Sequence, residues 1–315
     1  MKPLYIVNPR SGGGRTGQVF EGMRRTIERI AGPFEVAFTE RPRHAVDLAR
    51  DAAADGRDTV IAVGGDGSIH EVTCGLMAAR EANGGELPTK LGILGQGTGG
   101  DFRRTLGIDH RLDRYLQVIA AGKTREVDVG RFTYQAHDGT DKSAYFINIL
   151  SVGMGGLVDQ YVADIGRTVG GTAAYLVASL RGIAGSVEGH LKVTARHAGK
   201  ETVEHFSARI LGVCNGRFFG SGMEVAPMAD PSDGQFEVIT MGGAKVSFIL
   251  TLPRVYSGKH LTNPDVRHFP CDRITVELEN ESVADRFLLD VDGEPLGKLP
   301  LTIELVPRAL SVLAP

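Results

Sequence analysis

The sequence predicts an α/β protein with two domains: an N-terminal three-layer domain built on a parallel sheet, and a C-terminal β-rich, sandwich-like domain. Three observations support this prediction. Short apolar runs alternate with glycine-rich turns and helical patterns over the first third of the chain, the segments after about residue 126 are mostly strand-like, and 315 residues suffice for about two domains. We expect the domains to span 1–125 and 126–315, with a return of the last residues to the first domain left open.

The elements of the first domain follow from the spacing of the apolar residues and from the turn residues between them. The predicted strands are short apolar runs at 4–7, 34–38, 59–63 and 91–94. The predicted helices have apolar residues at helical spacing and span 19–31, 44–54 and 69–79. Glycine-rich loops follow three of the strands, at 8–14, 64–68 and 95–102.

The second domain is predicted from strand-like segments, several of which alternate apolar with polar residues as strands with one solvated face do. These segments span 126–132, 143–150, 190–196, 207–214, 236–241, 273–278, 287–291 and 302–306. Between them, residues 158–183 are rich in Ala, Leu and Val and predict one or two helices. The sequence contains no internal repeat and no low-complexity segment that would change this order.

Composition excludes several classes of function. A net charge of −3 argues against a nucleic-acid-binding protein. No apolar run approaches the ~18 residues of a membrane-spanning helix, and the first residues lead into a strand without a signal-peptide pattern, so we expect a cytoplasmic protein. Cys74, Cys214 and Cys271 lie far apart in the sequence, which argues against a disulfide framework and against a thiolate zinc site.

The three glycine-rich loops predict a nucleotide or phosphate site. Ligands of open parallel sheets bind beyond the carboxyl ends of the strands, and residues without Cβ let several backbone N–H groups approach phosphate oxygens. The P-loop pattern and the dinucleotide-binding fingerprint are both absent from the sequence. Asp66 stands among these glycines, and we expect its carboxylate to face a magnesium ion, a metal-bound water or a hydroxyl.

Ordered motifs along nearly the whole chain resemble the diacylglycerol kinase catalytic-domain family, which includes YegS-like lipid kinases and sphingosine and ceramide kinases. The motifs of the first domain are Ile6 to Gly12, Gly64 to Ser68 and Leu91 to Phe102. Phosphofructokinases and NAD kinases are similar in the second of these loops. The second domain looks like the lipid kinases instead, through Phe146 to Gly153, Cys214 to Met223 and Leu289 to Pro295.

This resemblance implies an ATP-dependent lipid kinase whose active site lies in the cleft between the two domains. It would transfer the γ-phosphoryl group to a lipid alcohol, such as a diacylglycerol, a sphingoid base or a ceramide-like alcohol. The positions that match the family's nucleotide-binding residues are Asn8, Pro9, Arg10, Ser11, Gly12, Thr39, Gly64, Gly65, Asp66, Gly67, Ser68, Ile69, His70 and Thr98.

The resemblance also implies catalytic and metal-binding residues. Glu294 matches the family's proposed proton acceptor, and Asp292, two positions away, is the rival base. A magnesium site regarded as structural or regulatory matches Asp230, Asp233 and the carbonyl of Gln235. The reacting Mg²⁺ would arrive with ATP, near Asp66 and Asp101.

Each assignment has a structural alternative. Residues 292–294 also fit a β-turn, because Asp-Gly is a common hairpin turn, and Asp230 and Asp233 fit a solvated turn. His70 replaces the Asn usual in the family, and Gly100 replaces the Asn of its GTGND motif, so the nucleotide preference stays open. His70 could equally be a residue on the surface of its helix.

A lipid substrate implies transient peripheral contact with the inner face of a membrane. The apolar stretches 158–183 and 246–252, each beside basic residues, could make this contact, although packing on the protein's own core is the alternative. An edge strand could pair across a two-fold axis, so a homodimer is a further open expectation. The alternative functions are an NAD-kinase-like enzyme with a soluble substrate and a catalytically weak, nucleotide-binding regulatory protein.

Overall fold

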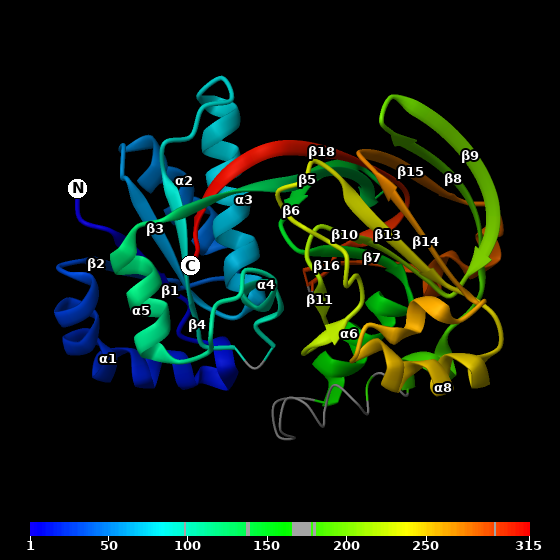
Figure 1. Cartoon of the computed structure of the whole chain (residues 1–315), viewed down its shortest axis with the longest axis horizontal. Coiled ribbons are helices and arrows are strands. Elements are labelled where there is room, and N and C mark those ends of the chain that lie inside the picture. Colours follow the sequence, from blue (N-terminus) through cyan, green and yellow to red (C-terminus); the bar gives the residue numbers. More distant parts are fainter. Residues whose placement is uncertain (98, 137–138, 166–177, 179–180, 293) are drawn as a thin grey trace. The chain divides into compact units, whose positions relative to one another are not determined.

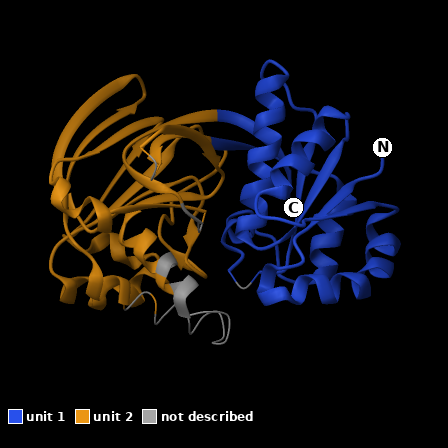
Figure 2. Ribbon diagram, turned by 180° about the vertical axis from the view of Figure 1, so that it is seen from behind, with its two compact units in different colours: residues 1–129, 307–315 blue, residues 130–306 orange. Residues whose placement is uncertain are grey.

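The computed structural model divides the chain into unit 1, residues 1–129 and 307–315, and unit 2, residues 130–306 (Figure 2). It describes all residues except 98, 137–138, 166–177, 179–180 and 293. The division falls after residue 129 and the predicted one after residue 125, and both positions lie within the single strand β5 (Thr124–Ala136). The last residues lie in unit 1, as the end of the long strand β18 (Gly297–Leu313).

Unit 1 contains a parallel sheet with the strand order β2-β1-β3-β4 (Figure 1). The strands are β1 (Leu4–Val7), β2 (Glu35–Phe38), β3 (Thr59–Gly64) and β4 (Lys90–Gly95). The end of β18 adds in parallel beside β4, with Val312 opposite Leu91. The helices are α1 (Arg15–Ala31), α2 (His44–Ala54), α3 (Asp66–Ala82), α4 (Asp101–Thr105) and α5 (Leu112–Ala121).

Helices cover both faces of this sheet, which is why its central strands are continuous apolar runs. The connection from β1 to β2 runs toward one edge of the sheet. The connections from β2 to β3 and from β3 to β4 run toward the other edge. Right-handed crossovers therefore place α1 on one face and α2 and α3 on the other. Accordingly, α1 packs with α5, and α2 packs with α3. The helices α1 and α3 begin at residues 15 and 66, earlier than predicted, because polar and glycine residues form their first turns.

The contact between α2 and α3 depends on Gly75. A Cβ at this position would overlap the carbonyl oxygen of Val46 and lie 2.8 Å from the Cβ of Ala49. We expect Gly75→Ala to lower the free energy of unfolding by about 1–3 kcal/mol, since overpacking outweighs the gain in helix propensity. Gly22→Ala in α1 is the matched control, because a Cβ there meets nothing within 4 Å, and it should raise stability by ~0.5–1 kcal/mol. Urea unfolding of both variants tests this; equal effects would contradict it.

Unit 2 contains two sheets that face each other. One has the order β14-β13-β10-β7-β16-β17, and the other consists of β18, β15, β8 and β9 with β5 and β6 attached. The strands are β6 (Asp141–Phe146), β7 (Ile149–Gly153), β8 (Gly189–His197), β9 (Lys200–Ala208), β10 (Ile210–Cys214), β13 (Phe236–Met241), β14 (Val266–Cys271), β15 (Arg273–Leu278), β16 (Leu288–Val291) and β17 (Glu294–Pro295). A short hairpin of β11 (Phe218–Phe219) and β12 (Met223–Glu224) and the helices α6 (Met154–Ile165) and α8 (Lys245–Val255) complete the unit.

The two sheets form a sandwich, because both contribute side chains to one buried core. Val152 of β7 and Val238 of β13 meet Val193 of β8 and Ile274 of β15 in this core. Successive side chains of a strand point to opposite faces, so the neighbouring residues of β7 and β13 point away from the core. This second face of the six-stranded sheet is covered by helices.

Two predicted strands of unit 2 need correction, and strand β9 was missed. The segment 143–150 is not one strand, because β6 ends at Phe146 and β7 starts at Ile149. The segment 207–214 divides between the end of β9 and β10. Strand β9 itself was not predicted, since nearly all of its side chains are exposed and it carries little apolar signal. Of the predicted helical region 158–183, α6 covers the start, and most of the remainder lies outside the described residues.

No helix in the described part of the chain is long and apolar enough to cross a membrane.

Candidate active site

Three loops of unit 1 meet at one edge of its sheet. They follow β1, β3 and β4, which are parallel neighbours, so their carboxyl ends lie side by side. The backbone N–H of Asn8 donates to the carbonyl of Val63 at 3.0 Å, and the N–H of Gln96 donates to the carbonyl of Gly64 at 2.7 Å. Thr39, after β2, reaches the same edge and donates its N–H to Val7 at 2.9 Å. The structure therefore brings the predicted loops together.

Glycine is required where these loops approach each other. A Cβ on Gly97 would lie 2.6 Å from the Cα of Gly65, and a Cβ on Gly64 would overlap the Ser68 hydroxyl. Gly12 has a φ of +59°, and a Cβ there would lie 2.9 Å from the carbonyl oxygen of Gln96. The loops thus present backbone rather than side chains to a ligand.

Asn8 connects the first two loops. Its side-chain amide donates to the Ser68 hydroxyl at 3.3 Å, and its side-chain oxygen accepts the N–H of Arg10 at 3.0 Å. The Ser11 hydroxyl donates to the carbonyl of Asn8 at 2.9 Å. These bonds fix the loop that runs through Pro9 and Arg10, and the Arg10 side chain is exposed there.

The first turn of α3 offers N–H groups to an anion. The helix begins at Asp66, and its N-cap is Gly65, which has no side chain to accept the first N–H groups. The N–H groups of Asp66 and Gly67 belong to this turn, where the helix dipole also favours negative charge. The loops and this turn fit the phosphates of a nucleotide.

Asp66 holds the third loop in place. One carboxylate oxygen accepts the N–H of Gly100 at 2.8 Å, and the other accepts the N–H groups of Asp101 at 3.0 Å and Phe102 at 3.4 Å. This carboxylate was expected to face a metal ion or a hydroxyl, but its described contacts are to the backbone that starts α4. Asp101 is buried, with its carboxylate 3.9 Å from Arg104 Nε.

Two other predicted nucleotide-binding residues are buried in α3. His70 is 1% exposed, and its Nε2 lies 3.6 Å from the sulfur of Cys74 one turn later. The interpretation of His70 as a surface residue is therefore wrong: its helix face packs against the protein interior. Ile69 is also buried. Thr98 lies outside the described residues.

Residues that sequence reasoning missed support the third loop from α4 and α5. The Tyr115 hydroxyl lies 2.9 Å from His110 Nδ1, and a Cβ on Gly95 would overlap this hydroxyl. Burial raises the pKa of Tyr115 to about 12, so the phenol stays protonated. Arg103 donates to the carbonyl of Ile108 at 2.9 Å and is buried. No motif marks these residues, and only Tyr115 could have been placed on a helix, from the apolar period of 112–121.

Asp292 organises a turn within unit 2. Its carboxylate accepts the N–H groups of Ile147, Asn148 and Ile149 at 3.0–3.1 Å, and its side chain is buried. Its φ is +50°, a conformation that Asp tolerates better than most residues. These contacts give Asp292 a positioning role. Glu294 pairs its backbone with Val291 in β17; its side chain is outside the described part, so its role as base stays a prediction.

The predicted metal residues form a turn that is closed by its own hydrogen bonds. The carboxylate of Asp230 accepts the N–H of Ser232 at 2.9 Å, and that of Asp233 accepts the N–H of Gln235 at 3.1 Å and its side-chain amide at 3.2 Å. Burial raises the pKa of Asp233, and the negative charge of Asp230 adds to the rise. The described residues hold no group of three or more His, Cys, Asp or Glu arranged for a metal ion. The predicted site has two carboxylates and one backbone carbonyl, so it is not such a group and stays a prediction.

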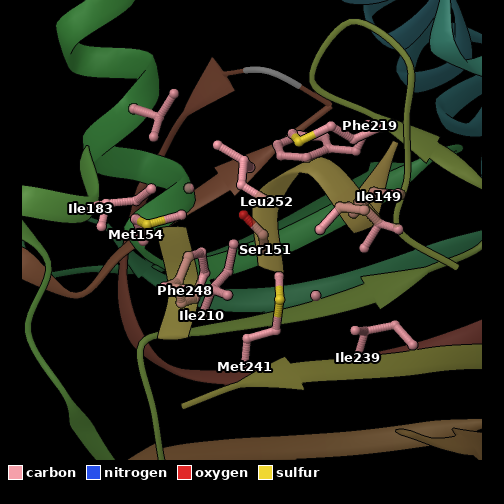
Figure 3. A pocket seen from close by; sticks show the side chains of 16 residues that line it. Ile149, Ser151, Met154, Ile183, Ile210, Phe219, Ile239, Met241, Phe248 and Leu252 are labelled. Carbon is pink, nitrogen blue, oxygen red and sulfur yellow. The ribbon is translucent and has the colours of Figure 1, made fainter. Parts of the chain in front are cut away.

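An apolar pocket lies within unit 2, on the face of the six-stranded sheet opposite the sandwich core (Figure 3). Its cavity volume is about 50 Å³, within a wider space of about 650 Å³ between the lining atoms that includes open solvent. The lining comes from β7, β10, β13, the β11–β12 hairpin and the helices α6 and α8. It consists of Ile149, Ser151, Met154, Gly155, Val158, Ile183, Ile210, Gly212, Phe219, Met223, Val225, Ile239, Met241, Phe248, Leu252 and Val255.

One polar side chain, Ser151, belongs to the lining that the structure describes (Figure 3). Its hydroxyl lies 3.4 Å from a carboxylate oxygen of Asp290, which is fully buried on the neighbouring strand β16. A Cβ on Gly155 would overlap the Ser151 hydroxyl, so the first turn of α6 can approach it only with glycine there. Sequence analysis missed both the pocket and the Ser151–Asp290 contact. An apolar strand in the sequence does not reveal whether a side chain packs against a neighbour or borders a cavity.

Comparison with known proteins assigns both halves of the chain. Residues 2–132 match the diacylglycerol kinase catalytic domain, and residues 148–314 match the YegS C-terminal NAD kinase beta sandwich-like domain. The chain therefore belongs to the diacylglycerol kinase catalytic-domain family in its YegS-like form, as the motifs predicted.

Relatives of similar length support this assignment. A protein of Citrobacter koseri named probable lipid kinase YegS-like is 30% identical over 276 residues, which cover 86% of this chain and 81% of the relative. A protein of Enterobacter sp. (strain 638) with the same name is 28% identical and covers 99% of this chain and 95% of its own. The crystal structure of a diacylglycerol kinase from Bacillus anthracis str. Sterne has the same fold, with a TM-score of 0.70 and 21% identity over 100% of this chain and 97% of that one.

Proposed function

We propose that this protein is an ATP-dependent lipid kinase that transfers the γ-phosphoryl group of ATP to the hydroxyl of a lipid alcohol. The observation that carries this proposal is the apolar pocket of unit 2, in a chain whose unit 1 has the glycine-rich loops of a kinase family. The pocket is lined almost entirely by aliphatic, methionine and phenylalanine side chains, which bind apolar groups rather than a polar, soluble acceptor such as NAD.

The nucleotide binds to unit 1 in this proposal. The N–H groups of Asp66 and Gly67 and the loops around Gly12 and Gly97 receive its phosphates, with the exposed Arg10 contributing positive charge. Phosphoryl transfer depends chiefly on alignment and on neutralisation of charge, and rigid backbone loops provide the alignment. Mg²⁺ bound to ATP would supply the remaining neutralisation of the phosphate oxygens.

The lipid binds to unit 2 in this proposal. Its acyl chain lies in the apolar pocket, and burial of each methylene group contributes ~0.8 kcal/mol to binding. The carboxylate of Glu294 accepts the proton of the lipid hydroxyl as the phosphoryl group is transferred. Asp292 keeps the turn before Glu294 in place through its three backbone contacts.

A transfer assay with a panel of acceptors tests the proposed function. The protein is incubated with Mg²⁺, γ-labelled ATP and mixed micelles that contain a diacylglycerol, a sphingoid base or a ceramide, and in parallel with NAD. We expect label in one class of lipid, and loss of that label in Glu294→Gln. Label in NAD alone would establish the NAD-kinase alternative, and nucleotide binding without any labelled product would establish the regulatory one.

A graded series at Gly212 tests the pocket itself. A Cβ on Gly212 would meet only ordinary contacts, with Cys214 Sγ at 3.6 Å and the carbonyl oxygen of Ile239 at 3.9 Å, so side chains here enter the pocket without disturbing the sheet. We expect kcat/KM for the lipid to fall in the order Gly, Ala, Val, Leu, and by about 30-fold or more for Gly212→Leu, since the pocket volume is lost. The KM for ATP serves as control and should stay within about twofold. An unchanged lipid KM in Gly212→Leu would contradict this use of the pocket.

A further inference from the structure

Helix α8 is apolar on two faces, of which only one lines the pocket. Phe248, Leu252 and Val255 line the pocket. Val246, Ile249 and Leu250 are 66%, 46% and 70% exposed. Their spacing of three and four residues places them together on the outer face of the helix. This outer face of α8 is the most exposed apolar surface on any helix that the structure describes.

The segment around this face is positively charged although the whole chain is not. Residues 244–264 contain Lys245, Arg254 and Lys259 and no Asp or Glu. The carboxylate of Asp265, the next residue, accepts the hydroxyl of Ser247 in α8, so residues 244–265 carry a net charge of +2, whereas the chain carries −3. All three basic side chains are exposed. Tyr256, directly after the helix, is 44% exposed and has the amphipathic ring typical of membrane–water interfaces. Apolar residues flanked by basic ones and an aromatic match the chemistry of an interfacial helix.

We propose that the outer face of α8 docks onto the surface of an anionic lipid bilayer. Val246, Ile249 and Leu250 enter the boundary between headgroups and acyl chains, and the basic side chains contact anionic headgroups. Charge favours this occupant over a second copy of the chain, because two copies joined through α8 would bring two segments of equal positive charge together.

This inference extends the proposed function, because a lipid kinase must take its acceptor from a bilayer. Phe248, Leu252 and Val255 on the other face of the same helix line the pocket, so one short helix has the bilayer on its outer side and the pocket on its inner side. A lipid that leaves the bilayer beside α8 therefore exchanges one apolar environment for another.

Vesicle sedimentation without nucleotide tests the docking surface. The full chain is mixed with vesicles of phosphatidylcholine alone or with an equal part of phosphatidylglycerol, and the partition coefficient is measured. We expect the double variant Val246→Ser/Leu250→Ser to reduce partitioning about tenfold or more on vesicles with phosphatidylglycerol. Arg254→Gln and Lys259→Gln should each reduce it about fivefold on the same vesicles.

Val203→Ser is the matched control, because Val203 is 53% exposed on β9, away from α8 in sequence and in element. It should partition within about twofold of the unchanged protein. Equal partitioning of the α8 double variant would overturn the proposal. So would sedimentation velocity in which the unchanged protein dimerises and the double variant does not, since α8 would then bind a second copy. Vesicle binding through α8 in a protein that labels no lipid would instead refute only the proposed function.

Discussion

Asp66→Asn is expected to lower kcat/KM for phosphoryl transfer by about 100-fold or more, a loss of ~2.7 kcal/mol of transition-state stabilisation. Both oxygens of the Asp66 carboxylate accept backbone N–H groups of Gly100, Asp101 and Phe102. An asparagine has one oxygen, so its amide nitrogen would face an N–H group of the same loop. The third loop would then move relative to the first two, and displacements of ~1 Å at a reacting centre cost about this much.

The control for Asp66→Asn is Asp109→Asn, which removes a negative charge from an exposed position whose described contact is an ion pair with Arg111 at 3.4 Å. It should leave kcat/KM within about twofold. Steady-state kinetics with ATP and the lipid identified in the acceptor panel measure both variants. If Asp66→Asn keeps more than a third of the activity, Asp66 does not position the loop as its contacts indicate.

Asp292→Asn is expected to lower the free energy of unfolding of unit 2 by about 3 kcal/mol and to abolish most of the activity. Its buried carboxylate accepts three backbone N–H groups, two on Oδ1 and one on Oδ2. Hydrogen bonds to a charged group contribute a net ~1.5–3 kcal/mol each, and asparagine keeps only one of the two oxygens. Asparagine tolerates the same left-handed backbone, so the substitution isolates the loss of the carboxylate.

Thermal unfolding followed by circular dichroism measures this change, and a loss of about 3 kcal/mol corresponds to roughly 6–12 °C for a unit of this size. Asp285→Asn is the control, because Asp285 is exposed and pairs with Lys298 at the surface. An Asp292→Asn protein with unchanged stability and a large loss of activity would contradict the positioning role and support Asp292 as the base.

Sequence patterns predicted the part of the fold in which each element carries its own signal. The strands around Ile6, Ile61 and Ile93 are buried on both faces and therefore appear as continuous apolar runs. Strand β9 gives the opposite case, because it lies at the edge of its sheet with mostly exposed side chains and has almost no apolar pattern. Its position depends on pairing with β8, a contact between strands that a local pattern does not encode.

The candidate site divides in the same way. The glycine loops were predictable, because close backbone approach requires glycine at positions such as Gly64 and Gly97. The partners of Asp66 and Asp292 were not, since each carboxylate bonds to backbone groups 34 to 145 residues away. Nearly every residue type has a backbone N–H group, so these hydrogen-bond partners leave no motif in the sequence. For the same reason the pocket beside Ser151 emerged only from the packing of α6 and α8 on the sheet.

Transfer of the γ-phosphoryl group from ATP to a lipid is tested by comparing two positions of the label in ATP under the same conditions. The protein is incubated with lipid vesicles, Mg²⁺ and ATP that carries the label in either the γ- or the α-phosphate, and the lipids are then extracted. We expect labelled lipid from γ-labelled ATP, about 30-fold less of it or lower still in Gly212→Leu, and none from α-labelled ATP. Label transferred from the α-phosphate, or an unlabelled lipid fraction with γ-labelled ATP across every lipid alcohol, would contradict the proposed function.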